Sequence, residues 1–160
     1  MGVEAFGLTL QLIAPEPCGE LKTLLEQYPH FCRWTEETTA HGSIAAGEYN
    51  DGSHIIECQL IQEPATCSLA IRFSLCSFDS IDQAFIDLVK HVLSYYDAEV
   101  WLMTSAIQQK EHYPLGESIW LSATLPDEII AMRKHWQKLF GAKQGVVRVK
   151  DSFSFVGVKQ

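Results

Sequence analysis

The sequence predicts an α+β fold: a largely antiparallel sheet of about six to eight strands, with about three helices packed on one face as a two-layer sandwich. Apolar and polar residues alternate with period two in several segments, most regularly over residues 66–76. Asn50, Asp51 and Gly52 separate two such segments, as in a tight β-hairpin turn. Three other segments repeat their apolar residues with helical spacing. Consecutive strands joined by short turns pair as antiparallel neighbours, which excludes a parallel doubly wound sheet.

The first half of the chain predicts five strands and one helix. The expected helix covers residues 18–28, between Pro17 and Pro29, and residues 36–42 are expected to form a polar loop. The expected strands cover residues 4–13, 31–35, 43–49, 53–61 and 66–76. In the last strand the apolar face consists of Cys67, Leu69, Ile71, Phe73 and Leu75. The last three of the five strands predict a meander.

A second helix is expected from Ser80 onward. Ser80 is a typical N-cap, and Gln83 stands at the position that completes a capping box. The apolar stripe of this helix consists of Ile81, Phe85, Leu88, Val89, Val92 and Tyr96. Asp79 and Asp82 lie where carboxylates complement the helix dipole. That role explains the two aspartates better than the alternative, in which they form half of a metal site.

The last part of the chain predicts two strands, a third helix and a short extended tail. Residues 99–104 and 118–124 are expected to pair as a hairpin across a long loop, residues 105–117. A helix over residues 126–140 places Trp136 on its inner face and ends at Gly141. Residues 146–150 and 153–158 are expected to be extended.

Length and composition fit a single domain over residues 1–160. The chain has 160 residues, of which 47% are hydrophobic and 20% charged, and this excludes a disordered chain. No run of about 18 apolar residues occurs, so no membrane span is expected. The formal net charge is −8, which disfavours nucleic acid and anionic lipid as partners. Residues 133–160 are nevertheless basic, with seven Lys or Arg against Asp151 alone, and we expect this segment to fold back onto the acidic body.

The five cysteines and the amino-terminal residues indicate a cytoplasmic protein with free thiols. The number of cysteines is odd, no Cys-x-x-Cys pair occurs, and the first residues lack the pattern of a signal peptide. His30 with Cys32, and His54 with Cys58, are conceivable ligand pairs, but neither has a second half for a structural zinc site. We therefore expect no metal and no cofactor. Phosphate-loop, dinucleotide-binding, serine-elbow and zinc-protease motifs are also missing from the sequence.

Two groups of residues are candidates for a ligand site. Glu111, His112 and Tyr113 follow Lys110 in the expected loop, where a histidine beside a carboxylate and a phenol is able to move protons near neutral pH. Glu48 and His54 flank the hairpin turn. A two-residue turn would pair Glu48 with Ile55, whereas a three-residue turn would bring Glu48 beside His54. In both groups an ordinary solvated surface is the simpler explanation, and no catalytic residue is assigned.

The function expected first is a non-enzymatic protein-binding module of the inhibitor or immunity type, by analogy of charge and size. An acidic surface would speed association with a basic partner. Its candidate contact residues are Glu36, Glu37, Glu57, Trp101 and Trp120. The first alternative is a small-ligand or enzymatic site under residues 105–117. The second is a structural subunit that pairs with a second copy of itself.

Overall fold

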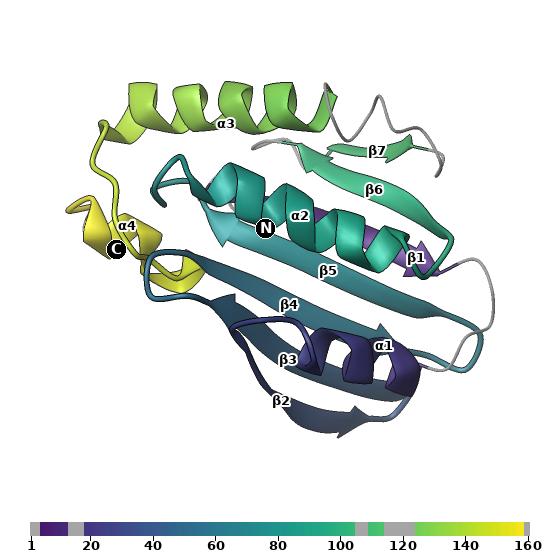
Figure 1. The fold of residues 1–160 in the computed structure, drawn as a ribbon. Coiled ribbons are helices and arrows are strands. Elements are labelled where there is room, and N and C mark those ends of the chain that lie inside the picture. Colours follow the sequence, from purple (N-terminus) through teal and green to yellow (C-terminus); the bar gives the residue numbers. More distant parts are fainter. Residues whose placement is uncertain (1–3, 13–17, 105–108, 114–123, 159–160) are drawn as a thin grey trace.

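The computed structural model describes residues 4–12, 18–104, 109–113 and 124–158. These residues form one seven-stranded antiparallel sheet and four α-helices, which confirms the predicted fold class (Figure 1). The strands are β1 Ala5–Leu12, β2 Phe31–Thr39, β3 Gly42–Asn50, β4 Ile55–Gln62, β5 Cys67–Ser74, β6 Ala98–Thr104 and β7 Gln109–Tyr113. Their order in the sheet is β2-β3-β4-β5-β1-β6-β7. The predicted meander therefore occupies one half of the sheet, and β1 joins it to the other half.

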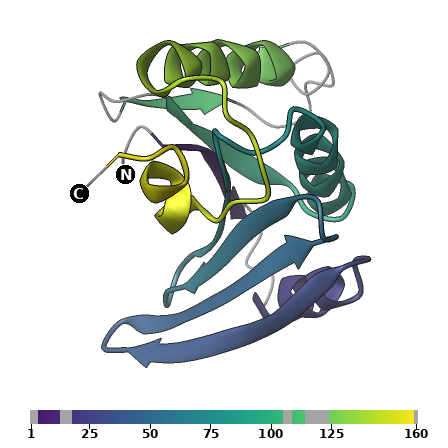
Figure 2. The ribbon, with the colours of Figure 1, turned by 90° about the vertical axis from the view of Figure 1, so that its left-hand side faces the viewer.

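The helices are not all on one face of the sheet. They are α1 Cys18–Glu26, α2 Ile81–Leu93, α3 Leu125–Phe140 and α4 Ser152–Phe155, the last preceded by a 3-10 turn, η2 Val149–Asp151. Figure 2 shows α1 and α2 on one side of the sheet and α4 on the other, with α3 beside the β6–β7 edge. A strict two-layer sandwich is therefore not confirmed. We call the side covered by α1 and α2 the helix face, and the opposite side the open face.

The core lies between the sheet and its helices, with α2 at its centre and α1 and α3 adding to it. Phe6 on β1 and Phe73 on β5 are register partners, with ring centroids 5.8 Å apart. Both contact Phe85 of α2 edge-on, with centroids 5.7 and 5.0 Å apart. All three side chains are fully buried. Burial of a large apolar side chain contributes about 1.5–3 kcal/mol, so this aromatic trio holds α2 on the sheet. The predicted apolar faces of β5 and α2 and the inward position of Trp136 are confirmed.

The expected loop over residues 36–42 is wrong, because β2 continues to Thr39 and turns directly into β3. The backbone of β2 forms hydrogen bonds with the backbone of β3, while the threonine and glutamate side chains of this edge strand remain in water. The pairing shifts by a bulge between Cys32 and Thr35, which places Phe31 and Trp34 on the same side, against Gly47. A Cβ at Gly47 would lie 2.9 Å from the Phe31 ring and 3.1 Å from the Trp34 ring, so these two rings require a glycine there.

The β3–β4 hairpin adopts neither expected register. Asn50 pairs with Ile55, so residues 51–54 form a four-residue connection and Glu48 lies opposite Glu57. The connection is longer because the Asp51 carboxylate accepts hydrogen bonds from the backbone N–H groups of Ser53 and His54, at 2.9 and 2.8 Å. Such aspartate turns compete with the tightest two-residue turn.

Two expectations for the later part of the chain are also wrong. Gln109–Tyr113, expected within a loop, is strand β7 and pairs with β6, so the partner of β6 is not the segment 118–124. Residues 114–123, which include most of that expected strand, lie outside the described residues. The segments 146–150 and 153–158, expected to be extended, contain η2 and α4 instead.

At the start of α2 the expected capping box is not formed. Ser80 is the N-cap residue, but its side chain makes no capping hydrogen bond. Asp79 and Asp82 instead hold Arg133 of α3, whose guanidinium is buried and bonds both oxygens of Asp82, Nη1 to Oδ2 at 2.8 Å, with Nε 3.2 Å from Asp79. This ion pair ties α3 to the amino end of α2. The contact of both aspartates with Arg133 was not predicted from the sequence, which assigned them to the helix dipole alone.

The basic carboxyl-terminal segment folds back onto the acidic body, as the charge distribution predicts. Arg133 contacts Asp79 and Asp82, and Arg148 lies 2.9 Å from Glu48. Ser152 packs beside Ser74 on the open face, with their hydroxyl oxygens 2.6 Å apart. The segment therefore covers one end of the open face.

The cysteines are not all free. Cys32, Cys58 and Cys76 are free thiols, whereas Cys67 is disulfide-bonded, which corrects the expectation for that residue. Burial raises the pKa of the Cys58 thiol, and the charge of Glu57 raises it further, so Cys58 stays protonated and inert. Among the described helices, none combines the length and the apolar character that a membrane crossing requires.

Candidate functional site

The register of the sheet places small and charged side chains in two neighbouring rows across the open face. One row contains Cys32, Glu48, Glu57, Arg72 and Gly7, which follow each other as partners from β2 to β1. The next row contains Thr35, Ala46, Gln59, Ala70, Thr9 and Trp101. Because the second row is built mainly from short side chains, the surface forms a depression over it. The charged row forms one wall of this depression.

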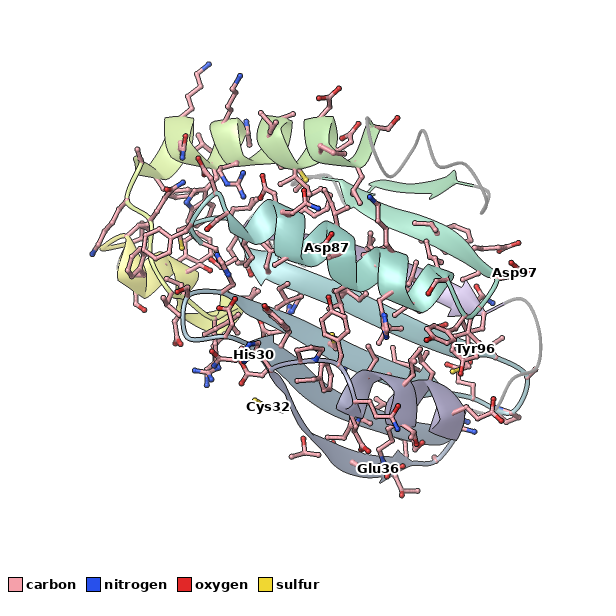
Figure 3. The ribbon with its side chains drawn as sticks, in the orientation of Figure 1. His30, Cys32, Glu36, Asp87, Tyr96 and Asp97 are labelled. Atoms are coloured by element: carbon pink, nitrogen blue, oxygen red, sulfur yellow. The ribbon has the colours of Figure 1, made fainter. Side chains whose placement is uncertain are left out.

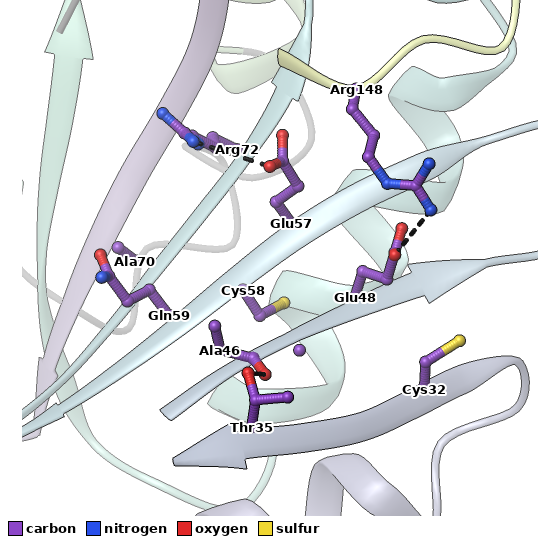
Figure 4. A pocket seen from close by; sticks show the side chains of 11 residues that line it. Cys32, Thr35, Ala46, Glu48, Glu57, Cys58, Gln59, Ala70, Arg72 and Arg148 are labelled. Carbon is purple, nitrogen blue, oxygen red and sulfur yellow. Dashed lines mark hydrogen bonds and ion pairs between the residues drawn. The ribbon is translucent and has the colours of Figure 1, made fainter. Parts of the chain in front are cut away.

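The two glutamates of the charged row are each bound by groups from distant parts of the chain. Figure 4 shows the pair of Arg148 and Glu48. Arg148 donates to Glu48 Oε1 at 2.9 Å, and the backbone N–H of Val149 donates to Glu57 Oε2 at 3.0 Å. The hydrogen bond to Glu48 raises the pKa of Arg148. Neighbouring carboxylates on paired strands repel each other, so these contacts stabilise an otherwise unfavourable pair.

Arg72 and Glu57 form a looser pair. Their nearest charged atoms, Arg72 Nη2 and Glu57 Oε1, lie 3.6 Å apart, which is longer than a hydrogen bond. The Arg72 side chain is 42% exposed, and it passes over Gly7, where a Cβ would lie 3.1 Å from the Arg72 Cβ. Both charged groups therefore keep hydrogen-bonding capacity that no described residue uses.

These residues line a hollow of about 500 Å³ on the open face. Its floor includes Ala46, Gly47 and Ala70, and its walls carry Glu48, Glu57, Arg72 and Arg148. Cys32, Thr35, Cys58 and Gln59 complete the lining. The size is within the usual range for small-molecule sites, about 300–1,000 Å³. Two carboxylates and two guanidinium groups balance each other's charge in the hollow.

A second polar cluster links the β3–β4 hairpin to α2. The Asp51 carboxylate lies 2.9 Å from His54 Nδ1, and His54 Nε2 lies 2.6 Å from the Ser80 hydroxyl oxygen. Tyr49 also donates its hydroxyl proton to Asp51 Oδ2, at 2.9 Å. Burial would raise the pKa of Asp51, but hydrogen bonds from His54, the Ser53 N–H, Tyr49 and the His54 N–H outweigh it and hold the pKa below its usual range. Asp51 is therefore ionised.

The ionised carboxylate fixes the direction of the hydrogen bonds in this cluster. A carboxylate only accepts hydrogen bonds, so His54 Nδ1 carries a proton and donates a hydrogen bond to Asp51. In the neutral imidazole Nε2 is then an acceptor, and the Ser80 hydroxyl donates to it. The order of the three groups is carboxylate, imidazole and hydroxyl.

The structure separates the residues that the sequence singled out. Glu48 and Glu57 lie together at the hollow, whereas His54 belongs to the second cluster. Trp101 is half-buried, and its Cα partner on β7 is His112. Glu111 and Tyr113 are also on β7, where they pair with Leu102 and Val100. Trp120 lies outside the described residues.

Glu36 and Glu37 lie on the edge strand β2, away from the hollow's walls. Glu36 is at the border of the sheet beside α1, where it pairs with Lys22 at 2.9 Å (Figure 3). Glu37 is exposed and forms no ion pair with a described residue. The single acidic face expected from the sequence is therefore divided: its glutamates on β3 and β4 are paired with arginines, and those on β2 are at the edge.

Arg72, Arg148, Asp51 and Ser80 were not predicted as site residues. The alternation in β5 places Arg72 on the face opposite the apolar residues of that strand. Its position next to Glu57 could have been predicted only if the register between β4 and β5 had been known. Arg148 and Ser80 are brought in by tertiary contacts at separations of 100 and 26 residues, for which the sequence gives no local signal. In the described part of the chain, no group of three or more metal-ligating side chains is close enough to hold a metal ion.

Comparisons with known proteins add no functional information, because no protein-family model, no curated protein and no solved structure matches the chain.

Proposed function

We propose that this protein binds a small zwitterionic molecule, an amino acid or short peptide with a free ammonium and a free carboxylate group, in the hollow on the open face. The observation that carries the proposal is the loose pair of Arg72 and Glu57, 3.6 Å apart in the wall of the hollow. A guanidinium offers up to five N–H donors, and a carboxylate can accept several hydrogen bonds. The ligand carboxylate would bind Arg72 and its ammonium Glu57.

The balance of charge in the hollow supports a zwitterion over a simple anion or cation. A purely anionic ligand would approach Glu48 and Glu57, and a purely cationic one would approach Arg72 and Arg148. A zwitterion satisfies both signs and leaves the net charge of the hollow unchanged. The small side chains Ala46 and Ala70 leave room for its backbone.

The test is calorimetric titration with a panel of dipeptides and with matched forms that are acetylated at the amino end or amidated at the carboxyl end. We expect binding of the free dipeptides and at least about tenfold weaker binding of both blocked forms, because each lacks one charged contact of about 1.5–3 kcal/mol. Arg72→Met and Glu57→Gln should weaken binding in the same way. Lys150→Met is the control, since Lys150 is exposed, lies near Arg148 in the chain and lines no part of the hollow.

Two outcomes would contradict this assignment. One is the absence of binding by the whole panel at millimolar concentration. The other is binding that Arg72→Met and Glu57→Gln leave unchanged while both variants keep the circular dichroism of the parent protein.

The protein-binding module remains a second candidate, because β2 is an exposed edge strand. Its only neighbour in the sheet is β3, so one side of its backbone has no strand partner among the described residues. Glu36 and Glu37 are exposed on this strand, and a basic extended segment of a partner protein would add its backbone to β2 and its cations to the glutamates.

Fluorescence anisotropy of a lysine-rich, β-prone peptide tests this candidate. We expect salt-sensitive binding that Glu37→Lys weakens and that Asp97→Lys, a change at an exposed residue just before β6 in the other half of the sheet, leaves unchanged. Dimerisation of the protein in light scattering, without peptide binding, would instead favour a second copy as the partner of this edge.

A further inference from the structure

We propose that Ser80 is a nucleophile activated by His54 and Asp51, and that it accepts acyl groups from activated esters. The three side chains come from two separate elements, the β3–β4 hairpin and the amino end of α2. Carboxylate, imidazole and hydroxyl in this order form the arrangement that converts a serine hydroxyl into a nucleophile. This inference concerns a different cluster from the hollow and does not depend on its ligand.

The distances fit direct proton transfer. Ser80 Oγ lies 2.6 Å from His54 Nε2, and His54 Nδ1 lies 2.9 Å from Asp51 Oδ2. Both are within the reach of about 2.6–3.2 Å that a general base needs. Because Nδ1 donates to the carboxylate, the lone pair of Nε2 points to the hydroxyl that must lose its proton.

The orienting carboxylate is rigidly held. Asp51 Oδ1 accepts from the backbone N–H groups of Ser53 and His54, and Oδ2 accepts from Tyr49 and from His54. The imidazole is partly buried, with an exposed fraction of 15% for its side chain. A fixed carboxylate maintains one tautomer of the histidine and stabilises the imidazolium that forms during the reaction.

Ser80 is exposed, and its hydroxyl does not cap α2. A serine at an N-cap normally accepts a hydrogen bond from the first turn of its helix, but Ser80 makes no such bond. Its hydroxyl is turned to His54 instead, and the residue is exposed. It also lies at the positive end of the dipole of a 13-residue helix, which favours the negative charge of an oxyanion. Arg133 offsets the charges of Asp79 and Asp82 nearby.

The reaction is a two-step acyl transfer. Ser80 Oγ attacks the ester carbonyl carbon while its proton moves to His54 Nε2, and the bond to the leaving alcohol then breaks as Nε2 returns the proton to the alcohol oxygen. Water next attacks the acyl-Ser80 carbonyl and gives a proton to Nε2. The acyl bond to Ser80 breaks, Oγ regains the proton, and the carboxylic acid is released.

The direct test is labelling with a fluorophosphonate, a probe that reacts with activated serine hydroxyls, followed by mass spectrometry of the intact protein and of its peptides. We expect one adduct, located on Ser80. Ser80→Ala should abolish it, and His54→Gln should slow labelling about 100-fold, the usual lower contribution of a general base. Ser94→Ala is the matched control, because Ser94 is an exposed serine at the other end of α2 whose hydroxyl bonds a backbone carbonyl.

Hydrolysis of p-nitrophenyl acetate gives an independent readout with the same variants. Turnover that Ser80→Ala and His54→Gln remove, and that Ser94→Ala retains, supports the proposal. The proposal is overturned if the folded parent protein gives no adduct at Ser80, or if His54→Gln, folded by circular dichroism, labels at the parent rate. The first of these outcomes needs no variant and so does not depend on how well any variant folds.

Discussion

Glu48 and Glu57 lie directly opposite each other on β3 and β4, and each carboxylate is bound by the same short carboxyl-terminal segment, through Arg148 and the Val149 N–H. The segment thus holds together two like charges that would otherwise repel across the strand pair. This relationship connects the stability of the open face to the shape of the hollow.

Removal of the Arg148 guanidinium should destabilise the protein modestly. Arg148→Met leaves Glu48 and Glu57 facing each other, and we expect a loss of about 0.5–1 kcal/mol in urea denaturation, small because the arginine is 43% exposed. The double variant with Glu48→Gln should recover most of the loss, since the repulsion disappears with the charge. Equal stability of Arg148→Met and Lys150→Met would show that the ion pair contributes nothing.

Asp51 should make the protein sensitive to acid. Hydrogen bonds in the hairpin lower the pKa of Asp51 in the folded state, against the opposing effect of burial. The stabilisation is therefore complete above the pKa of an unfolded aspartate, about 3.9, and is lost as the pH falls below it. Urea midpoints measured down to about pH 2.5 should fall less steeply for Asp51→Asn than for the parent or for Asp97→Asn. Parallel curves for all three proteins would be evidence against this account.

Tyr49 should make the protein sensitive to alkali. Burial, the hydrogen bond to Asp51 and the charge of Asp51 raise the pKa of Tyr49 to about 12. The folded state keeps its proton more tightly, so the contribution to stability is complete below the unfolded value, about 10, and is lost as the pH rises toward about 12. Burial and the charge of Asp87 also raise the pKa of Tyr28. An ultraviolet titration should therefore show a late phenolate step whose amplitude Tyr49→Phe reduces and Tyr95→Phe retains. A titration without that step in the parent protein would contradict the prediction.

The aromatic trio of Phe6, Phe73 and Phe85 should dominate the core. Phe85→Ala is expected to cost about 3–5 kcal/mol of unfolding free energy, the usual loss for a buried phenylalanine. Phe78→Ala, three residues before α2 and 41% exposed, should change stability by no more than about 0.5 kcal/mol. Thermal unfolding followed by circular dichroism measures both. A small effect of Phe85→Ala would mean that α2 is not held by these rings.

The sequence predicts the parts of the fold that depend on local pattern. The alternation in β5 and the stripe of α2 determine which side chains are buried, and both predictions are confirmed. The register of the β3–β4 hairpin is wrong because the Asp51 carboxylate, rather than Gly52 alone, sets the turn. The predicted partner of β6 is wrong because the charged and polar residues of β7 have the composition of a loop.

The candidate sites depend on contacts that no local pattern encodes. Glu48, Glu57 and His54 could be singled out, since polar residues near a hairpin are visible in the sequence. Their partners Arg148 and Ser80 could not, because each comes from another element and its position follows from how the tail and α2 pack. The sequence therefore indicates only part of each site, and it wrongly places His54 and Glu48 in a single site.

β1 lies between β5 and β6, although it is made before either of them. On the ribosome its apolar side emerges before its two neighbours in the sheet, and the first of them is available only when β5 has been synthesised. The strands β2 to β5 are neighbours in the chain and can assemble while translation continues, whereas β1 must wait and then insert beside β5. We expect nascent chains stalled before β5 to engage a chaperone through β1, and longer ones to be released from it.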